Sequence, residues 1–327
     1  MFSISFQTST VAIIQIFFMG AMGFYLVRSK IVNEAGLKLL SFLSVNVFFP
    51  LFIFNQIINH FDARQMPFWW GFPLINISLV LSGFLIASLV LIRSKNTVKD
   101  EFLAASCLHN AGYIPLLLAM SLPLGAWANQ IYTCVILSVI GFDTCLWSLG
   151  VWLLTRSKSS RMDLRKMINP PLLSMSAALI IVLVFGTGSV PGIVLKPIRL
   201  LGDVAMGIAM IVIGGNLAMS NFKRINWYQI SGVVLIKLIF IPLIALVVLY
   251  ALKLNPLLSF VAIVQACMPS SITLSIIGRH YETDNQDFIN QSIFMTHLLS
   301  MLTIPIYPGE SNCDRLFYWS LWLSSVK

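Results

Sequence analysis

Two short polar segments interrupt long apolar stretches of the chain, and each of them contains a proline. The first runs from residue 107 to 115 and the second from 265 to 273. Proline removes one backbone donor and prevents a regular helical turn. Because freed carbonyl groups find no partner in hydrocarbon, a helix broken there must be buried in protein or line a wet cavity. The side chains that could bind a solute at these breaks are His109, Asn110, Gly112, Pro115, Gln265, Pro269, Ser270, Ser271 and Thr273.

Helices broken in this way can bind ions. The N-terminal end of each half-helix carries partial positive charge that attracts an anion, whereas the freed carbonyl groups can hold a cation. We therefore predict that an anionic substrate binds at the two breaks, and that Na⁺ could bind near Asn110 and Ser270. The alternative is a pair of proline kinks without a binding role, which membrane helices also tolerate. Polar neighbours at both breaks favour a site.

Ionisable side chains inside apolar stretches are costly and therefore indicate function. Asp143 lies near the middle of one stretch, where we expect either a buried structural partner or a proton-linked role. Lys237 lies within another, where its long stem could carry the ammonium to the interface or to a structural partner. Both are candidates for a coupling or buried charge. Arg199 and Asp203 are spaced to pair on one helical face.

The composition indicates that these residues lie in a membrane. Hydrophobic residues make up 58% of the 327-residue chain and charged residues 10%, with a mean hydropathy of +0.88. Soluble domains carry about 25% charged residues. The net charge of +9 lies mostly in short breaks between apolar stretches, which argues against a nucleic-acid partner. The five cysteines form no Cys-x-x-Cys pair, so neither zinc nor a disulfide framework is expected.

The predicted fold is an all-α membrane protein with ten transmembrane helices. Each crossing needs roughly 20 mainly apolar residues. The expected spans are 8–27, 38–58, 68–92, 102–122, 130–154, 170–186, 197–219, 229–252, 257–278 and 288–307. The first is expected to be retained rather than cleaved as a signal peptide. The two polar breaks fall in spans four and nine, and Pro50 should bend span two, where its Phe and Leu neighbours indicate packing only.

The basic residues predict the orientation of the spans. Fourteen of the 21 Lys and Arg residues lie in breaks after odd-numbered spans, and three lie in breaks after even-numbered ones. Because positive charge is retained on the cytoplasmic side, both termini should face outward. An integral protein of a bacterial inner membrane is expected.

The longest basic loop, residues 156–169, divides the chain into five-helix repeats at 1–155 and 170–307, followed by an atypical tail at 308–327. An odd number of spans in each half makes the second repeat inverted relative to the first. A weak internal match supports the division, because Lys38 then corresponds to Arg199, and Asn55 to Asn216.

Seven short segments follow one another in an order that is typical of a known family. They are Leu43–Pro50, His109–Leu116, Asn169–Leu172, Leu201–Asp203, Gly214–Leu217, Lys237–Pro242 and Leu299–Pro305. Over residues 10–307 the chain resembles the auxin efflux carrier family, which includes plant PIN carriers and bacterial organic-acid permeases and is related in fold to bile-acid sodium symporters.

The resemblance implies two inverted repeats in which helices four and nine cross at their broken centres. It also implies a scaffold, a transport part that moves in an elevator-like fashion, and a homodimer. Carried over by position, the crossing elements are Asn110, Gly112, Pro115 and Pro269 with its polar neighbours. Family substrates are small organic anions such as auxin, malate or malonate. The acidic residue and lysine that plant carriers have on span three are absent here, which leaves coupling by that route in doubt.

We therefore predict a secondary active transporter of a mono- or dicarboxylate, with no cofactor other than Na⁺ or H⁺ as the coupling ion. One alternative is a membrane receptor or sensor on the same fold. An intramembrane enzyme is not expected, because the serine-protease and zinc-protease motifs are absent. An aspartyl protease would need Asp143 and Asp203 at matching depth, and their positions in the spans differ.

Overall fold

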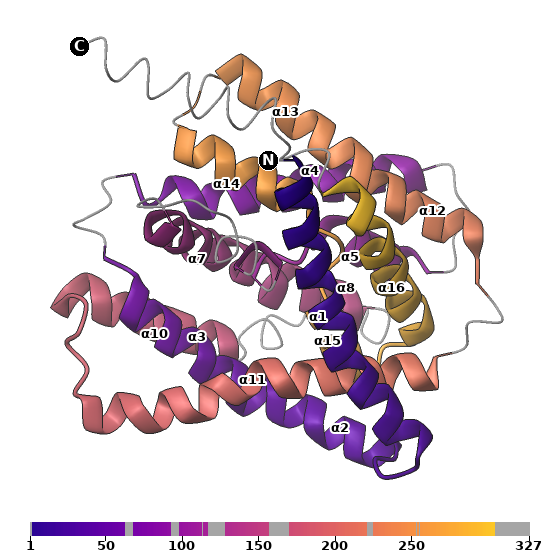
Figure 1. Cartoon of the computed structure of the whole chain (residues 1–327), viewed down its shortest axis with the longest axis horizontal. Helices are drawn as coiled ribbons and strands as arrows, with labels where there is room; N and C mark the ends of the chain where they lie inside the picture. Colours follow the sequence, from indigo (N-terminus) through magenta and orange to yellow (C-terminus); the bar gives the residue numbers. More distant parts are fainter. Residues whose placement is uncertain are drawn as a thin grey trace.

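The computed structural model describes residues 2–62, 68–92, 98–112, 114–116, 128–156, 170–220, 225–252, 254 and 256–304, and its regular structure is helical (Figure 1). Five helical stretches within this part of the chain are long and apolar enough to cross a membrane. They are Glu34–His60, Gly71–Leu91, Cys134–Thr155, Gly192–Met219 and Trp227–Leu252. The predicted all-α membrane class is therefore confirmed, whereas the count of ten crossings and the inverted repeat remain predictions.

Most helix bounds lie within a few residues of the predicted spans. The helices are α1 (Phe2–Arg28), α2 (Glu34–Leu43), α3 (Phe49–His60), α4 (Gly71–Leu91), α5 (Lys99–Cys107), α7 (Ala128–Cys145), α8 (Val151–Thr155), α10 (Pro170–Phe185), α11 (Gly192–Met219), α12 (Trp227–Leu235), α13 (Ile241–Leu252), α14 (Pro256–Ala266), α15 (Thr273–His280) and α16 (Gln286–Thr303). Within the described chain, π-helical segments connect some of these helices into continuous rods. They are η1 (Ser44–Phe48), η3 (Leu146–Gly150) and η6 (Ile236–Phe240).

Local sequence explains where several helices begin and end. The Asn33 side chain accepts a hydrogen bond from the backbone of Gly36 and caps the start of α2, and Asn226 caps α12 in the same way. Between α10 and α11 the chain turns at Gly186 and Gly188, whose φ angles of +85° and +76° suit glycine. These signals set the lengths of the helices.

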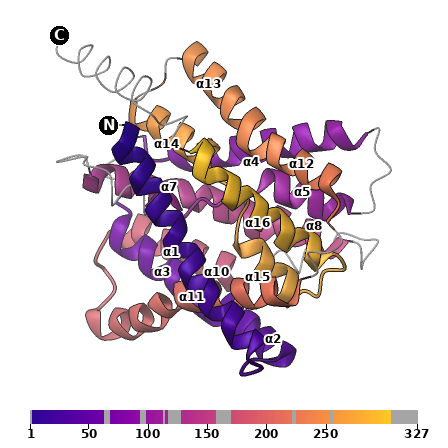
Figure 2. The same ribbon diagram turned by 45° about the vertical axis from the view of Figure 1, so that its right-hand side comes forward.

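The helices form two layers (Figures 1 and 2). In the first layer α1 packs against α11, and α10 and α11 pack against the rod of η1 and α3. The second layer contains α4, α5, α7, α8 and the helices from α12 to α16, with α4 against α7 and α12 against α16. Helix α3 touches α7, and α2 and α11 touch α15, so the layers meet along these helices.

Glycines allow the closest approaches within the layers. A Cβ atom on Gly214 of α11 would lie 1.8 Å from the carbonyl oxygen of Gly20 on α1, and one on Gly23 would lie 2.2 Å from that of Ile211. Between α4 and α7, a Cβ on Gly141 would lie 2.1 Å from the oxygen of Pro73. Small residues let membrane helices approach backbone to backbone, where van der Waals contact takes the place of the hydrophobic effect.

Candidate functional site

The two polar breaks meet in the second layer and are joined through their backbones. Helix α5 ends at Cys107 and α14 at Ala266, and the segments that follow run antiparallel. The Asn110 amide donates to the oxygen of Pro269 at 2.8 Å, and the Ser271 amide donates to that of Leu108 at 3.0 Å. Each break thus supplies partners for backbone groups that the other leaves without helical hydrogen bonds.

Hydrogen bonds from buried side chains also stabilise this junction. Gln265 donates from its amide nitrogen to the oxygen of Ala111 at 3.0 Å and to Ser138 Oγ at 2.8 Å. The hydroxyl of Ser270 donates to the oxygen of Ala105 at 2.7 Å. His109 Nε2 lies 3.1 Å from Asn76 Oδ1. These three predicted site residues support the junction and are absent from the wall of the cavity described next.

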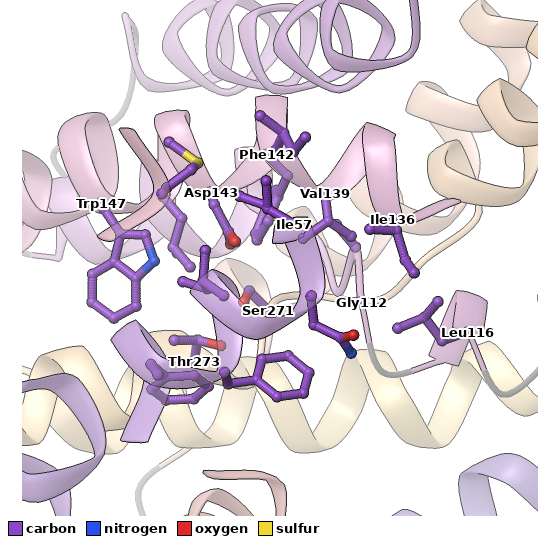
Figure 3. A pocket seen from close by; sticks show the side chains of 18 of the residues that line it. Ile57, Gly112, Leu116, Ile136, Val139, Phe142, Asp143, Trp147, Ser271 and Thr273 are labelled. Atoms are coloured by element: carbon purple, nitrogen blue, oxygen red, sulfur yellow. The ribbon is translucent and has the colours of Figure 1, made fainter. Parts of the chain in front are cut away.

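A cavity lies beside the junction, between the two layers (Figure 3). About 770 Å³ of space between atoms lies within it, a figure that includes open solvent at its mouth. Helix α3, helix α7 with η3, Met175 of α10 and both polar breaks form its walls. Its aromatic residues are Phe49, Phe52, Phe142 and Trp147. Its polar residues without an aromatic ring are Gln56, Asn110, Asp143, Ser271 and Thr273.

The polar groups of the cavity gather at the start of α15. Thr273 is the first residue of that helix, and Ser271 precedes it by two positions. The start of a helix carries partial positive charge. The Leu274 and Ser275 amides of α15 donate to the oxygens of Ser271 and Ile272, at 3.3 and 3.1 Å, so the polar side chains are the groups that face the cavity. Asn110, held within 3.4 Å of His297 Nε2, contributes an amide from the other break. This end of the cavity can therefore bind an anionic group through neutral donors.

The structure separates the predicted site residues into two groups. Asn110, Gly112, Ser271, Thr273 and Asp143 line the cavity. The remaining predicted residues are not among its lining residues and are buried in the described protein. They are His109, Pro115, Gln265, Pro269, Ser270 and Lys237.

Lys237 does not extend to the membrane interface, which was one of its expected arrangements. It lies in η6, its relative exposure is 1%, and its ammonium has no hydrogen-bond partner among the described residues. The Arg199–Asp203 pair forms as predicted, with 3.6 Å between Nε and Oδ2 on the exposed face of α11. Asp203 is thus exposed whereas Asp143 faces the cavity, so the two aspartates have different surroundings.

The aromatic wall on α3 was missed from the sequence. Packing alone was expected around Pro50, but Phe49 and Phe52 line the cavity together with Gln56. Gln56, which follows Asn55 within a membrane span, is a signal that could have identified this face. In the described residues no group of three or more His, Cys, Asp or Glu side chains could hold a metal ion. The predicted Na⁺ position near Asn110 and Ser270 remains a prediction.

Comparison with known proteins agrees with this architecture. The profile of the family described as membrane transport protein matches residues 8–164 and 154–308. A transporter of uncharacterised activity from Methanocaldococcus jannaschii is 24% identical over 299 residues, covering 88% of this chain and 93% of the relative. Another from Methanothermobacter thermautotrophicus is 22% identical over 313 residues, covering 92% and 98%. The matched region stops at residue 308, where the predicted atypical tail begins.

Proposed function

Since the chain belongs to the membrane transport protein family, the auxin efflux carrier family that its motifs resemble, we propose that it is a secondary active transporter of a small organic anion. The observation that carries this proposal is the junction of two broken helices beside a cavity that both breaks line. Paired broken helices are the usual pointer to a transport site.

The substrate is a mono- or dicarboxylate whose charged end binds near the start of α15. The amide of Asn110 and the hydroxyls of Ser271 and Thr273 bind it, and the partial positive charge at the start of that helix favours the anion. Among the described residues that line the cavity there is no Lys, Arg or His. Neutral donors bind a carboxylate without holding it as tightly as an ion pair would, which suits a carrier that must release its substrate.

In this proposal, transport results from movement of one layer relative to the other. The proposed fold has ten spans in two inverted repeats. Its first layer is the scaffold, and its second layer, which contains the junction, is the part that moves. Because the junction is held by buried hydrogen bonds, it moves as a rigid unit and carries the substrate past α3 and α10. Alternating access by such an elevator-like motion requires the lipid bilayer and an ion gradient of Na⁺ or H⁺.

The test is tracer flux in proteoliposomes with a panel of labelled mono- and dicarboxylates, under inward Na⁺ and H⁺ gradients. The wild type should take up at least one of them. Asn110→Ala and Ser271→Ala should each lower uptake by roughly 10-fold or more, because each removes a donor to the substrate charge. Ser176→Ala is the matched control, since the Ser176 hydroxyl donates to its own helix at Leu172 and lies outside the cavity.

Wild-type flux that persists unchanged in both cavity variants would place the site elsewhere. Saturable carboxylate binding by the wild type without any flux would instead favour the receptor or sensor alternative.

A further inference from the structure

We propose that the carboxyl group of Asp143 is the proton-binding site of this protein, so that one proton moves together with the organic anion. This inference rests on the proposed transport function. Asp143 lies on α7 and lines the same cavity as the polar end of the junction (Figure 3). Within the part of the chain that the structure describes, its carboxylate has no hydrogen bond and no ion pair.

The surroundings of Asp143 contain no compensating charge. Helix α3 contributes aromatic and aliphatic side chains and the neutral Gln56, and α10 contributes Met175. The two breaks contribute the neutral Asn110, Ser271 and Thr273, so that in the described lining no other acidic or basic group faces the carboxyl. An ionised carboxylate in such a cavity is costly, and a second anion beside it is more so, because the effective dielectric constant is low.

Binding of a proton to Asp143 removes this repulsion between two negative charges. The proton binds a carboxylate oxygen of Asp143 in the cavity, and the neutral acid then allows the substrate anion to bind at the start of α15. After the second layer moves, the anion leaves and the proton returns to water on the other side. No covalent bond of the substrate forms or breaks, and a monovalent anion with one proton carries no net charge.

The experiment measures proton entry and carboxylate uptake together, in proteoliposomes that contain a pH-sensitive dye. The carboxylate is one that the wild type transports from the panel above. We expect an inward proton gradient to accelerate wild-type uptake with proton entry at a fixed ratio. Asp143→Asn, whose amide cannot take up a proton, should lose proton entry, and Asp143→Glu should keep it. Asp203→Asn is the matched control, because Asp203 is exposed and pairs with Arg199.

An unchanged ratio of protons to substrate in Asp143→Asn would overturn this inference and leave the proposed function intact. Wild-type uptake driven by a Na⁺ gradient without proton entry would also overturn it. A wild-type protein that moves none of the carboxylates would overturn the proposed function itself.

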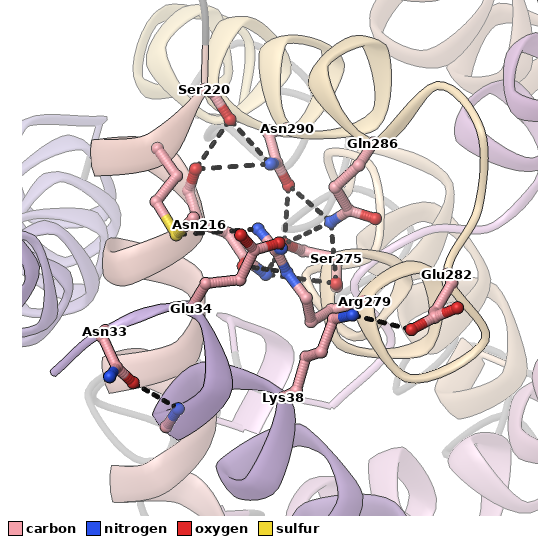
Figure 4. Close-up of polar contacts among 12 residues, drawn as sticks. Asn33, Glu34, Lys38, Asn216, Ser220, Ser275, Arg279, Glu282, Gln286 and Asn290 are labelled. Carbon is pink, nitrogen blue, oxygen red and sulfur yellow. Dashed lines mark hydrogen bonds and ion pairs between the residues drawn. The ribbon is translucent and has the colours of Figure 1, made fainter.

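A separate set of contacts supports a second inference about the boundary between the layers (Figure 4). At the end of α11, the Asn216 amide donates to Ser275 Oγ on α15 at 2.8 Å. Arg279 Nε, one turn further along α15, donates back to Asn216 Oδ1 at 2.9 Å. Asn290 of α16 donates to Ser220 Oγ at 2.7 Å. Asn216, Ser275 and Asn290 are at most 2% exposed, so the bond between Asn216 and Ser275 is buried, and the other two are partly buried.

Two ion pairs lie at the rim of this buried network and also join the layers. Arg279 Nη1 is 3.2 Å from Glu34 Oε1, and Lys38 Nζ is 2.7 Å from Glu282 Oε1. Glu34 and Lys38 belong to α2 of the first layer, whereas Arg279 and Glu282 belong to the second. The Arg279 side chain is 12% exposed, and it connects the buried network to the rim.

The corresponding position of the first half has no comparable bridge in the described residues. Asn55 corresponds to Asn216 in the internal sequence match. Its carbonyl and side-chain oxygens both accept from Asn59 on the same helix, at 2.8 Å each. Across the described residues, the polar connection between the layers is therefore concentrated at one end of the protein.

We infer that this network, defined by Glu34, Lys38, Asn216, Ser275, Arg279 and Asn290, is a latch that closes the cytoplasmic end of the boundary between the layers. The breaks after odd-numbered spans carry the positive charge, which places Arg279 on the cytoplasmic side. Movement of the second layer toward the cytoplasm must break these contacts. The latch therefore favours the state in which the cavity is closed to the cytoplasm.

The test is cytoplasmic access to the cavity, measured as labelling of Thr273→Cys by a membrane-impermeant maleimide in inside-out vesicles. Arg279→Ala should raise the labelling rate roughly tenfold, a change typical of the coupling energies that bias two-state equilibria. The exchanged pair Glu34→Arg with Arg279→Glu should label more slowly than either single variant. Asp203→Ala is the control, because its ion pair lies within one helix.

Equal labelling in Arg279→Ala and in the parent Thr273→Cys protein would overturn the latch. So would an exchanged pair that labels as fast as the single variants.

Discussion

Lys237 is a buried lysine whose amine has no hydrogen-bond partner among the described residues. Its side chain is 1% exposed in η6, at a π-helical turn that leads into α13 and its Pro242. Segment η6 packs against α4, α5 and α16, so the ammonium lies inside the second layer rather than in the cavity. Burying a lysine amine without a partner costs free energy, either as desolvation of the ammonium or as the loss of its proton. Lys237 therefore lowers the stability of the fold that contains it.

Lys237→Met should stabilise the protein because it keeps the length of the side chain and removes a buried polar group that has no partner among the described residues. We expect a gain of about 1–4 kcal/mol, observed as a higher midpoint of thermal unfolding in detergent. Lys38→Met is the comparison, since Lys38 is 46% exposed in its ion pair and such pairs contribute about 0–1 kcal/mol. A lower midpoint for Lys237→Met would mean that the ammonium has a stabilising partner.

At the scale of helices, the contact between α1 and α11 depends on the absence of side chains. Gly214 and Gly23 lie where the two backbones meet. Gly202 similarly allows α11 to approach α3, because a Cβ atom on Gly202 would lie 2.9 Å from the Cα of Phe52. Ser174 of α10 also donates a hydrogen bond to the oxygen of Pro50. Close backbone contact of this kind fixes where the first layer presents Phe52 to the cavity.

Gly214→Ala should separate α1 from α11, because its Cβ would lie 1.8 Å from a backbone oxygen that cannot rotate away. The expected loss of stability is about 1–3 kcal/mol or more, measured by thermal unfolding in detergent. Gly207→Ala on the same helix is the matched control. Within the described chain, no side chain or backbone of another helix lies within 4 Å of its Cβ position, and alanine there should stabilise the helix by about 0.5–1 kcal/mol. Similar losses in both variants would show that the contact does not explain the effect.

At the scale of the whole molecule, the two halves of the chain are interlocked. Helix α1 of the first half packs on α11 of the second, and α10 of the second packs on α3 of the first. The second layer repeats this mixing, because the junction takes one segment of backbone from each half. Consequently neither layer consists of one half of the sequence, and both the cavity and the latch are formed by both halves.

The sequence predicted the helices and the two breaks well but could not assign their facing residues. Hydropathy placed the ends of α10 and α11 within a few residues, and the polar runs identified both segments of the junction. Which side chains line the cavity depends on how the breaks cross. Neighbours such as Ser270 and Ser271 therefore have different surroundings, since one is bonded to Ala105 and the other lies in the cavity wall.

The roles of Phe49 and Arg279 could not be predicted from the sequence, because they too depend on which helices pack together. A phenylalanine in a membrane span looks the same whether it meets lipid, another helix or a substrate, and only the packing of α3 against α7 decides among them. In the sequence, Arg279 is one of many basic residues that predict the orientation of the spans in the membrane. Its role becomes visible only where α15 meets α2 and α11.

The packing of α1 on α11 has a consequence for biosynthesis. The ribosome completes α1 long before α11, which ends at Met219, and α3 likewise precedes α10. During this interval the glycine face of α1 lacks its α11 neighbour, and lipid or a membrane chaperone must cover it. The first layer therefore assembles only after two thirds of the chain has been inserted, and a nascent chain arrested before residue 219 should be exposed to membrane quality-control proteases.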